Sequence, residues 1–449
     1  MSPVTVGIDI GSSSTKALAV DDGGQVVART RVAHDLRIPA PDRLEHDANQ
    51  AWRRGVRRAW RELSDDLDVA AVSVAAMVPT LAAVDGRGIA RTPGLLYGDA
   101  RGRGAGADGG DGGEVVGFLR WCAEQEPGAR GYWPAQAVAN AALGGRGAIG
   151  GVTAMSATPL FGGAGWDEQL AAGAGVDVAQ LAEVVADGEV VGETDGRSAG
   201  VPIDAGTIDA FAEQLVAGAD RDGDVLVILG TTLICWVVVP EWVEAPGLWT
   251  VPHTVPGKML VGGPSNAGGL FLDWVRGLVG SRPSDVDPAR VPVWVPYVRG
   301  ERVPLHDPDR RASLSGLDLT HGTGAVRRAA FEASGFVVRH VLDLAGVEAR
   351  RVVATGGGVR VPDWLQAVAD CTGLPVDVVA VPEGAALGAA WLARMTVDLE
   401  DAHAGAGRWA RTSHRVEPDP RWLRDADVRY RRYRELAGPA GEVGLPGLG

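Results

Sequence analysis

Lysine is almost absent from this sequence of 449 residues, and basic residues are in deficit overall. Lysine occurs only at Lys16 and Lys258, and the formal net charge is −14. An acidic surface repels nucleic acids and anionic lipids at long range, so we expect neither as a main partner. A small anionic ligand is still compatible with this charge, because its pocket needs only a few well-placed donors.

Cysteine is also scarce, and long apolar runs are missing. The three cysteines, Cys122, Cys235 and Cys371, lack the spacing of a metal motif, and the eight histidines include no close metal-like pair. We expect the cysteines to be small buried apolar residues, as fits a reducing cytoplasm. The N-terminus shows no signal peptide pattern, and no window approaches the roughly 20 apolar residues of a membrane helix.

The length and the apolar segments predict a two-domain α/β protein. Residues 4–10 form an apolar, β-branched run, and two further strand-like runs follow at 15–20 and 25–30. These runs are separated by short polar loops, which predicts a meander of three antiparallel strands. Residues 224–239 repeat the design of an apolar strand, a small polar turn and a second apolar strand.

The other predicted elements are spread along the chain. Residues 47–63 place Trp52, Val56, Ala59, Trp60 and Leu63 on one face of a helix that Asp47 can cap. The segment 102–113 is a low-complexity loop, and we expect helices in the Ala- and Gly-rich span 114–200. Further strands are predicted at 69–74, 80–84 and 351–354, and further helices at 325–344, 363–372, 384–395 and 422–436.

Two loops combine glycine with hydroxyl side chains, as phosphate-binding loops do. They are Gly11-Ser12-Ser13-Ser14 and Gly230-Thr231-Thr232, each directly after an apolar strand. Small residues in a tight turn let backbone N–H groups converge on a phosphate, and hydroxyls add further donors. Each loop alone is also compatible with an ordinary hairpin turn.

Two carboxylates lie where phosphoryl transfer would need them. Asp9 ends the first strand and could hold Mg²⁺ beside the phosphates, although a turn-capping aspartate would look the same. Asp209 precedes an amphipathic stretch and could accept the proton of a substrate hydroxyl. Simple capping of a helix N-terminus is the alternative interpretation of Asp209.

An ordered set of segments resembles the FGGY family of carbohydrate kinases, which includes xylulokinase, ribulokinase and glycerol kinase. The segments cover most of residues 3–395, and several motifs in the right order make chance agreement very unlikely. They read GIDIGSSSTKALAVDDGG, TPGLLYGDARG, AGTIDAFAEQLVAGADRDGDVLVILGTT, VGGPSNAGGLFLDWV, VPYVRGERVPLHDPDRRASLSGLDLTH, VVATGGGVRVPDWLQAVADCTGLPVDVV and EGAALGAAWLA.

The resemblance implies an actin/hexokinase-type (ribonuclease H-like) ATPase fold with two domains and an interdomain cleft. Residues 1–240 would form the sugar-binding and catalytic domain, and residues 241–449 the nucleotide-binding domain. It also implies ATP and Mg²⁺ as cofactors and a small sugar or polyol as substrate. Asp209 falls at the family's general base and Asp9 at its magnesium-linked carboxylate. The implied nucleotide contacts are Gly11, Ser12, Ser13, Lys16, Gly230, Thr231, Thr232, Gly356, Gly357 and Gly358, and the implied substrate contacts are Met77, Asp99, Arg101 and Asp209.

The sequence departs from the family where relatives contact the sugar. The family's Gln-Met-His or Gln-Gly-Pro stretch is matched by residues 76–79, Ala-Met-Val-Pro, so a hydroxyl-binding amide has become a methyl group. Tyr97 stands where the family has tryptophan, and Val361 replaces a small polar residue after the glycines. For Asp99 and Arg101, sugar contact and a surface ion pair are equally good interpretations.

The resulting expectation is a cytoplasmic, xylulokinase-like kinase that phosphorylates a sugar or polyol, with the oligomeric state, a homodimer included, left open. A catalytically degenerate member that binds nucleotide or sugar as a regulator is the alternative, motivated by residues 76–79 and the faint match over 102–200. A chaperone- or actin-like ATPase on the same fold is disfavoured, because the Asp209 segment and the C-terminal segments resemble sugar kinases specifically.

Overall fold

The computed structural model describes residues 3–102, 113–255, 257–280, 286–400 and 405–441, and they form two compact units. The first unit takes in residues 3–216 and 383–409, and the second takes in 217–382 and 410–441. The division expected at 240/241 would leave the strands at 224–239 in the first domain, whereas their contacts group them with the second unit. Of the expected loop at 102–113, residues 103–112 lie outside the described part of the chain.

The first unit is built on a seven-stranded mixed sheet. The strand order is β11-β12-β5-β1-β2-β3, and β13 also pairs with β5. The predicted N-terminal meander is confirmed: β1, β2 and β3 are antiparallel, while β5 runs parallel to β1. The bounds are β1 (Val4–Ile10), β2 (Ser14–Val20), β3 (Val26–Ala33), β5 (Val69–Ala76), β11 (Val190–Glu193), β12 (Pro202–Asp204) and β13 (Thr207–Ile208).

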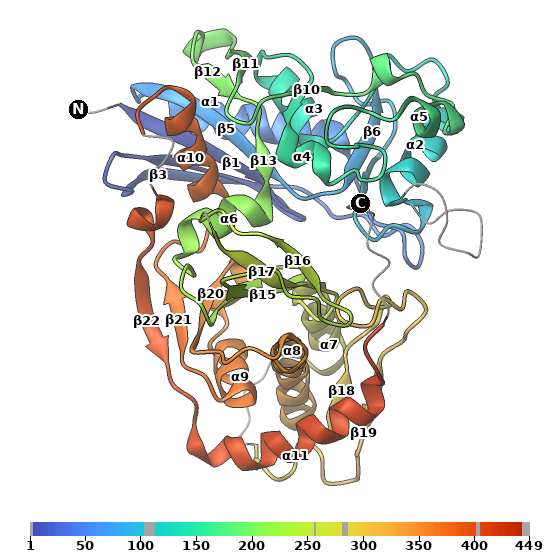
Figure 1. Cartoon of the computed structure of the whole chain (residues 1–449), viewed down its shortest axis with the longest axis vertical. Coiled ribbons are helices and arrows are strands. Elements are labelled where there is room, and N and C mark those ends of the chain that lie inside the picture. The colour runs from blue at the N-terminus through green and yellow to red at the C-terminus, as the bar shows by residue number, and fades with distance from the viewer. Residues whose placement is uncertain (1–2, 103–112, 256, 281–285, 401–404, 442–449) are drawn as a thin grey trace. The chain divides into compact units, whose positions relative to one another are not determined.

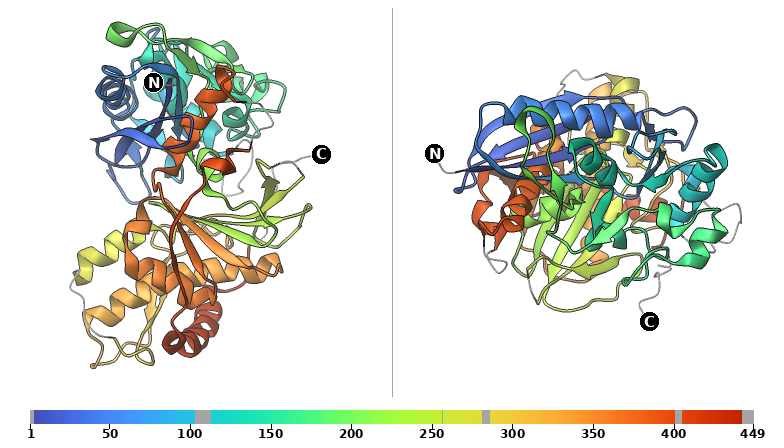
Figure 2. Two further views of the ribbon diagram at one scale, coloured as in Figure 1. Left: turned by 90° about the vertical axis from the view of Figure 1, so that its left-hand side faces the viewer. Right: turned by 90° about the horizontal axis from the view of Figure 1, so that it is seen from above.

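The alternation of side chains along β1 assigns a helix to each face of this sheet. On one face, Thr5 donates a hydrogen bond to the backbone oxygen of Ala390 in α10 (Gly384–Thr396) at 2.8 Å. Gly7 lies on the same face, where a Cβ atom would sit 1.9 Å from the backbone oxygen of Ala386. The intervening valine and isoleucine side chains pack with α1 (Gly55–Ser64) on the other face. Figure 2 shows these two helices on opposite sides of the blue strands.

Smaller elements complete the first unit (Figure 1). The helix expected at 47–63 is present, but its first turns are a π-helix, η1 (Asn49–Arg54), before α1, and all five predicted face residues are buried. Within 114–200 the expected helices occur, interrupted by short strands. The smaller elements of the first unit, within this span and outside it, are α2 (Gly113–Gln125), α3 (Ala135–Leu143), α4 (Gly151–Met155), α5 (Glu168–Gly173), α6 (Asp209–Ala217), β4 (Glu45–His46), β6 (Thr80–Val84), β7 (Gly94–Leu96), β8 (Gly131–Trp133), β9 (Ala148–Gly150) and β10 (Glu183–Val185).

The second unit repeats the same sheet design. Its strand order is β16-β17-β15-β14-β20-β21-β22, so an antiparallel meander is again followed by parallel strands. The strands are β14 (Asp224–Leu229), β15 (Leu233–Val239), β16 (Trp249–Pro252), β17 (Met259–Ser265), β20 (Arg351–Thr355), β21 (Val376–Val379) and β22 (Thr412–Val416), with β18 (Val293–Val295) and β19 (Ser313–Ser315) as a separate pair.

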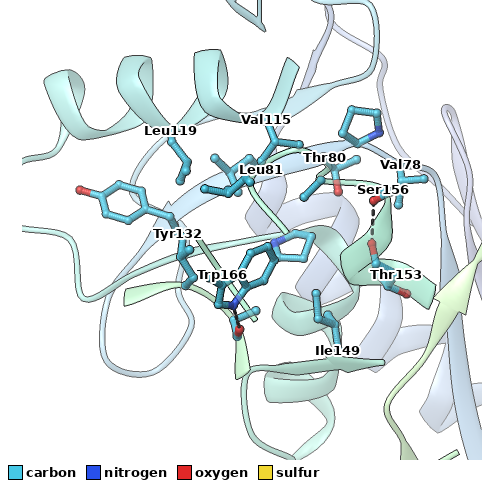
Figure 3. A pocket seen from close by; sticks show the side chains of 16 residues that line it. Val78, Thr80, Leu81, Val115, Leu119, Tyr132, Ile149, Thr153, Ser156 and Trp166 are labelled. Atoms are coloured by element: carbon cyan, nitrogen blue, oxygen red, sulfur yellow. Dashed lines mark hydrogen bonds between the residues drawn. The ribbon is translucent and has the colours of Figure 1, made fainter. Parts of the chain in front are cut away.

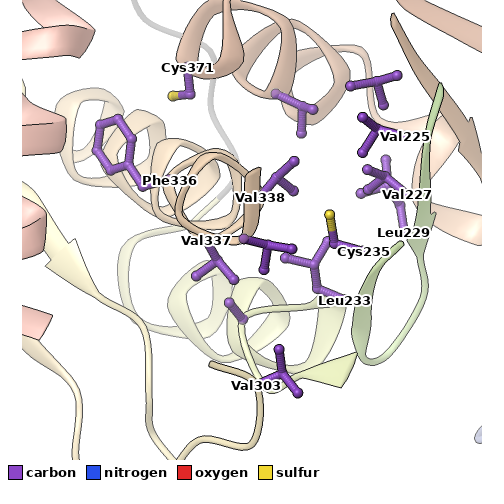
Figure 4. Close-up of a cluster of buried hydrophobic side chains, with 14 of the residues drawn as sticks. Val225, Val227, Leu229, Leu233, Cys235, Val303, Phe336, Val337, Val338 and Cys371 are labelled. Atoms are coloured by element: carbon purple, nitrogen blue, oxygen red, sulfur yellow. The ribbon is translucent and has the colours of Figure 1, made fainter. Parts of the chain in front are cut away.

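Helices α7 (Gly269–Val279), α8 (Thr323–Ala345), α9 (Pro362–Thr372) and α11 (Pro420–Ala437) complete the second unit. Its core lies between β14–β15 and α8, where Val227 and Leu233 face Val337 and Val338 (Figure 4). All three cysteines are buried and free, as expected. Among the described residues, no helix is long and apolar enough to cross a membrane.

Candidate functional site

The first Gly-and-hydroxyl loop is a tight hairpin between β1 and β2. Its backbone closes through the Gly11 N–H, which donates to the Ser14 oxygen at 3.1 Å. A hydrogen bond from His46 also restrains the loop. Trp52 Nε1 donates to His46 Nδ1 at 3.1 Å, so His46 Nε2 carries the proton and donates to the Ser12 backbone oxygen at 2.8 Å. Ser13 at the tip is exposed, so the loop leaves donors available to a ligand.

An ion pair lies on the strands just before this loop. Asp9 and Lys16 are opposite each other in the β1–β2 register, and Lys16 Nζ lies 3.0 Å from Asp9 Oδ2. Asp9 is 4% exposed. The charge of Asp9 raises the pKa of Lys16, with smaller contributions from Glu213 and Glu383. Lys16 is therefore held as a cation among carboxylates.

Asp209 lies at the same edge of the sheet as Asp9. Strand β13 runs parallel to β5, which runs parallel to β1, so the carboxyl ends of all three strands meet there. Asp209 follows β13 directly and is the first residue of α6, where the Ala210 N–H donates to its Oδ1 at 2.7 Å. Sequence patterns alone place it at a helix start, and the sheet places it beside Asp9.

The surroundings of Asp209 change its acidity. Burial, together with the negative charge of Asp9, raises the pKa of this half-buried carboxyl group to about 6. A carboxylate with such a pKa is ionised at neutral pH and yet a better proton acceptor than a free aspartate. This arrangement is suited to accepting a proton from a hydroxyl group.

Met77 follows β5 at this edge but is buried in the apolar core of the first unit, 4% exposed. The next residues, Val78 and Pro79, line a small cavity of about 30 Å³ with Thr153 and Trp166 (Figure 3). That volume holds one or two water molecules, whereas sites for small organic ligands usually need about 300 Å³ or more. The cavity is therefore too small to be a sugar site by itself.

Asp99 and Arg101 form an ion pair, but it is buried, unlike the surface pair that was one of the two interpretations of these residues. Asp99 is fully buried and the Arg101 side chain is 5% exposed. Arg101 contacts both oxygens of Asp99, its Nη2 also lies 2.8 Å from Glu45, and the Leu44 N–H donates to Asp99 Oδ2 at 2.5 Å. Because both carboxylate oxygens of Asp99 already accept hydrogen bonds from the protein, they are not free to bind a sugar hydroxyl.

The second Gly-and-hydroxyl loop lies in the second unit, between β14 and β15. The Gly230 N–H donates to the Thr232 oxygen at 3.1 Å, and the first residues of α7 bind the loop in turn. The Gly269 N–H donates to the Gly230 oxygen at 2.8 Å, and the Leu270 N–H to the Thr231 oxygen at 3.1 Å. The loop is thus fixed by a helix N-terminus, which favours anions.

Sequence analysis missed two charged residues near this loop. Arg302 Nη2 lies 3.5 Å from Thr232 Oγ1. Glu301, 3% exposed, accepts hydrogen bonds from Ser265 Oγ at 2.7 Å and from the Asn266 N–H at 2.9 Å, and burial raises its pKa to about 7. The segment VPYVRGERVPLHD carries part of the family resemblance, but no local pattern in it identifies these two residues.

The glycines at 356–358 lie beside the second loop. Strand β20 is parallel to β14, with Thr355 opposite Ile228, so both strands end at one edge. Gly356 has a φ of +87°, which glycine adopts without strain. A Cβ atom at Gly358 would meet Leu229 at 2.7 Å, so the turn packs closely on the strand that precedes Gly230.

The two units thus bring the candidate residues together in two separate groups. Asp9, Lys16 and Asp209 gather at one sheet edge of the first unit, and the two glycine-bearing turns gather at the corresponding edge of the second. Among the described residues, no group of three or more His, Cys, Asp or Glu side chains could hold a metal ion by itself.

Comparison with known proteins decides the family. Residues 4–102 match the N-terminal domain of the FGGY family of carbohydrate kinases, and residues 225–397 match its C-terminal domain. The chain is 30% identical to the xylulose kinase of Streptomyces coelicolor over 91% of both chains. It belongs to the FGGY family of carbohydrate kinases. It is also 32% identical to a glycerol kinase of Allorhizobium ampelinum, over 65% of this chain and 63% of that one.

Solved structures of other FGGY kinases share the fold. The xylulose kinase of Rhodospirillum rubrum gives a TM-score of 0.75 at 26% identity, covering 96% of this chain and 98% of that one. The gluconate kinase of Lactobacillus acidophilus gives a TM-score of 0.79 at 19% identity, covering 97% of each chain. The expected actin/hexokinase-type fold and the phosphotransferase class are confirmed for this FGGY member.

Proposed function

We propose that this FGGY kinase transfers the γ-phosphoryl group of ATP to a hydroxyl group of a small sugar or polyol, with Asp209 as the general base. The observation that carries this assignment is the carboxyl group of Asp209 at a parallel strand end, with a pKa raised to about 6. A carboxylate oxygen of Asp209 takes the proton of the acceptor hydroxyl while the hydroxyl oxygen attacks the γ-phosphorus, and the bond from this phosphorus to the bridging oxygen breaks to release ADP. Such proton transfer contributes typically about 10²–10⁴-fold to a rate.

We assign Asp9 to magnesium. Two buried or half-buried carboxylates at one sheet edge leave more negative charge there than Lys16 alone neutralises, and carboxylate oxygens are the ligands that Mg²⁺ prefers. A bound Mg²⁺ would neutralise phosphate charge during transfer. Lys16, kept cationic by Asp9, supplies a further positive charge at the first loop.

We assign nucleotide binding chiefly to the second unit. The Gly230–Thr232 loop offers backbone N–H groups and hydroxyls beside a helix N-terminus, and the turn at 356–358 lies next to it. The loop at 11–14 provides a second set of backbone and hydroxyl donors. A glycerol kinase of Plasmodium falciparum, whose solved structure contains ADP, shares this fold at a TM-score of 0.74.

A ketopentose such as xylulose is the acceptor that we propose first. The xylulose kinase of Streptomyces coelicolor aligns over 91% of this chain at 30% identity, and its substrate class is therefore the first to be tested. The side chains of Met77, Asp99 and Arg101 are all buried, and we propose that they shape the substrate region from within the protein. The proposal includes a cytoplasmic location, and a homodimer can be checked by light scattering.

Acceptor-dependent release of ADP tests the proposal. The purified protein is incubated with ATP and Mg²⁺ and with xylulose, ribulose, gluconate, glycerol or a pentitol, and ADP is measured by a coupled assay. Strong stimulation by xylulose is the expected result, and stimulation by another compound would correct the substrate. Binding of ATP with no acceptor-dependent ADP release across the panel would overturn the kinase assignment.

A further inference from the structure

Two amide side chains on α3 tie the strands of the first unit together. Gln136 and Asn140 are four residues apart on the helix and are both fully buried. Gln136 Nε2 donates to the backbone oxygens of Ala76 and Thr207, each at 3.1 Å. Asn140 Nδ2 donates in the same way to the oxygens of Ala148 and Ala205, each at 3.0 Å.

The bonds of Gln136 fall at the strand ends that carry the proposed base. Ala76 is the last residue of β5, and Thr207 is the first residue of β13, two residues before Asp209. β13 is only two residues long and pairs with β5 through Thr207 and Ile208. A strand this short has few ladder bonds, so a side chain that bridges its start to the end of β5 contributes much of its positional restraint.

The orientation of this amide is set by its acceptors. Gln136 Oε1 is buried and has no hydrogen-bond partner among the described residues, as is also true of Asn140 Oδ1. A flipped amide would place the Gln136 oxygen against two backbone oxygens, so only the observed orientation is favourable. The Gln136 amide therefore donates two hydrogen bonds and accepts none within the described part of the chain. We call its two bonds, which join the ends of two strands, the Gln136 clamp.

We propose that Gln136 is a positioning residue for the kinase reaction, holding the end of β13 against β5 so that Asp209 reaches the acceptor hydroxyl. This inference rests on the proposed role of Asp209. Proton transfer and attack require near-contact geometry, and a displacement of about 1 Å can cost on the order of 100-fold in rate. The sequence around Gln136 offers no sign of this role, because both carbonyl partners are distant in the chain.

The chain provides a matched control at Asn140. Gln136→Met and Asn140→Leu each replace an amide by an apolar group of similar size, and each removes two hydrogen bonds from a fully buried position. We expect similar melting temperatures for both variants. We expect kcat to fall by about 10- to 100-fold in Gln136→Met, with an unchanged KM for ATP, and to fall far less in Asn140→Leu. Equal kcat values in the two variants would overturn the proposal.

A second variant covers the case in which Gln136→Met does not fold. Gln136→Glu keeps the side-chain length, but its ionised form repels the two carbonyl oxygens, whereas its protonated form donates one hydrogen bond. The ratio of its kcat to the wild-type value should therefore rise as pH falls. A ratio independent of pH would contradict the clamp.

A measurement without turnover separates this inference from the kinase assignment. The pKa of Asp209 can be followed by carboxyl NMR in the wild-type protein and in the variants at 136 and 140. We expect it to move in Gln136→Met, or in Gln136→Glu where Gln136→Met does not fold, and to stay in place in Asn140→Leu. An unmoved pKa in the variant at 136 would reject the clamp even in an active enzyme, and inactivity of the wild type would reject only the proposed function.

Discussion

The two Gly-and-hydroxyl hairpins have a similar strand–loop–strand design, but they differ in charge at the register position two places before the loop glycine. In β1–β2, the residue two places before the loop glycine is Asp9, and it faces Lys16. In β14–β15, the residue at the same place is Ile228, and it faces Ile234. An ion pair in one hairpin thus corresponds to a pair of isoleucines in the other.

This difference separates the chemistry that each hairpin can support. The first hairpin carries a carboxylate that can hold Mg²⁺ and whose charge raises the pKa of Asp209. The second hairpin offers only backbone N–H groups, two threonine hydroxyls and the nearby Arg302. We infer that the first hairpin contributes to the reaction itself and that the second contributes mainly to holding phosphate. Breaking either hairpin should therefore have different kinetic consequences.

The largest effect is expected at the base beside the first hairpin. Asp209→Asn keeps the shape and the capacity to cap α6 but cannot accept a proton, so kcat should fall by about 10²–10⁴-fold. The binding of ATP, measured by calorimetry, should be nearly unchanged.

Asp167 supplies the control for simple capping. Its side chain accepts hydrogen bonds from the backbone at the start of α5, and it is exposed. Asp167→Asn should leave both kcat and stability close to wild type, because asparagine caps helices about as well as aspartate. A substantially active Asp209→Asn enzyme would reduce Asp209 to the same capping role.

A smaller and more diagnostic effect is expected from Asp9→Asn. Loss of the negative charge removes one cause of the raised pKa of Asp209, so that pKa should fall below about 6. The rate requires ionised Asp209 and declines as pH drops through this pKa; the acidic limb of the kcat profile should therefore move to lower pH. Affinity for Mg²⁺ should weaken by at least about 10- to 100-fold, the loss typical even of an outer-sphere partner. An unchanged magnesium dependence would remove Asp9 from the metal site.

The sequence predicts both hairpins because their signals are local. Alternating and β-branched apolar residues indicate the strands, and glycine with hydroxyl residues indicates the turns. The segment 47–63 is predicted as a helix for the same reason, and all five of its expected apolar face residues are buried. The prediction is less complete over 114–200, where alanine and glycine suit short strands as well as helices.

Residues whose roles depend on distant partners could not be predicted. Gln136 binds carbonyl groups 60 and 71 residues away, and Glu301 binds Ser265, which is 36 residues away. The sequence could not show that the Asp99–Arg101 pair is buried, because its partners Leu44 and Glu45 are more than 50 residues away in the chain. Only folding of the chain brings such partners together, so no spacing within one segment reveals them.

The packing of α7 against the loop of the second hairpin can be tested with a matched pair of glycines. A Cβ atom at Gly268 would lie 2.4 Å from the Leu233 nitrogen and from the Thr232 carbonyl carbon, whereas one at Gly277, on the exposed side of α7, would meet nothing within 4 Å. Gly268→Ala should lower the free energy of unfolding by about 1–3 kcal/mol and weaken ATP binding. Gly277→Ala should raise the free energy of unfolding by about 0.5–1 kcal/mol without changing the affinity for ATP. Equal behaviour in chemical denaturation and ATP titration would contradict the packing of α7 on the loop.

The smallest effect is expected from a single hydroxyl of the second hairpin. Thr231→Val removes one donor and keeps the side-chain shape, and a typical hydrogen bond contributes about 0.5–1.5 kcal/mol net. The KM for ATP should therefore rise several-fold with little change in kcat, whereas Thr231→Ser, which keeps the hydroxyl, should stay close to wild type. A loss confined to kcat would instead give this hairpin the reactive role that its apolar strands argue against. That outcome would break the contrast with Asp9 and Lys16, because a hairpin without an ionisable pair would then act in the chemical step.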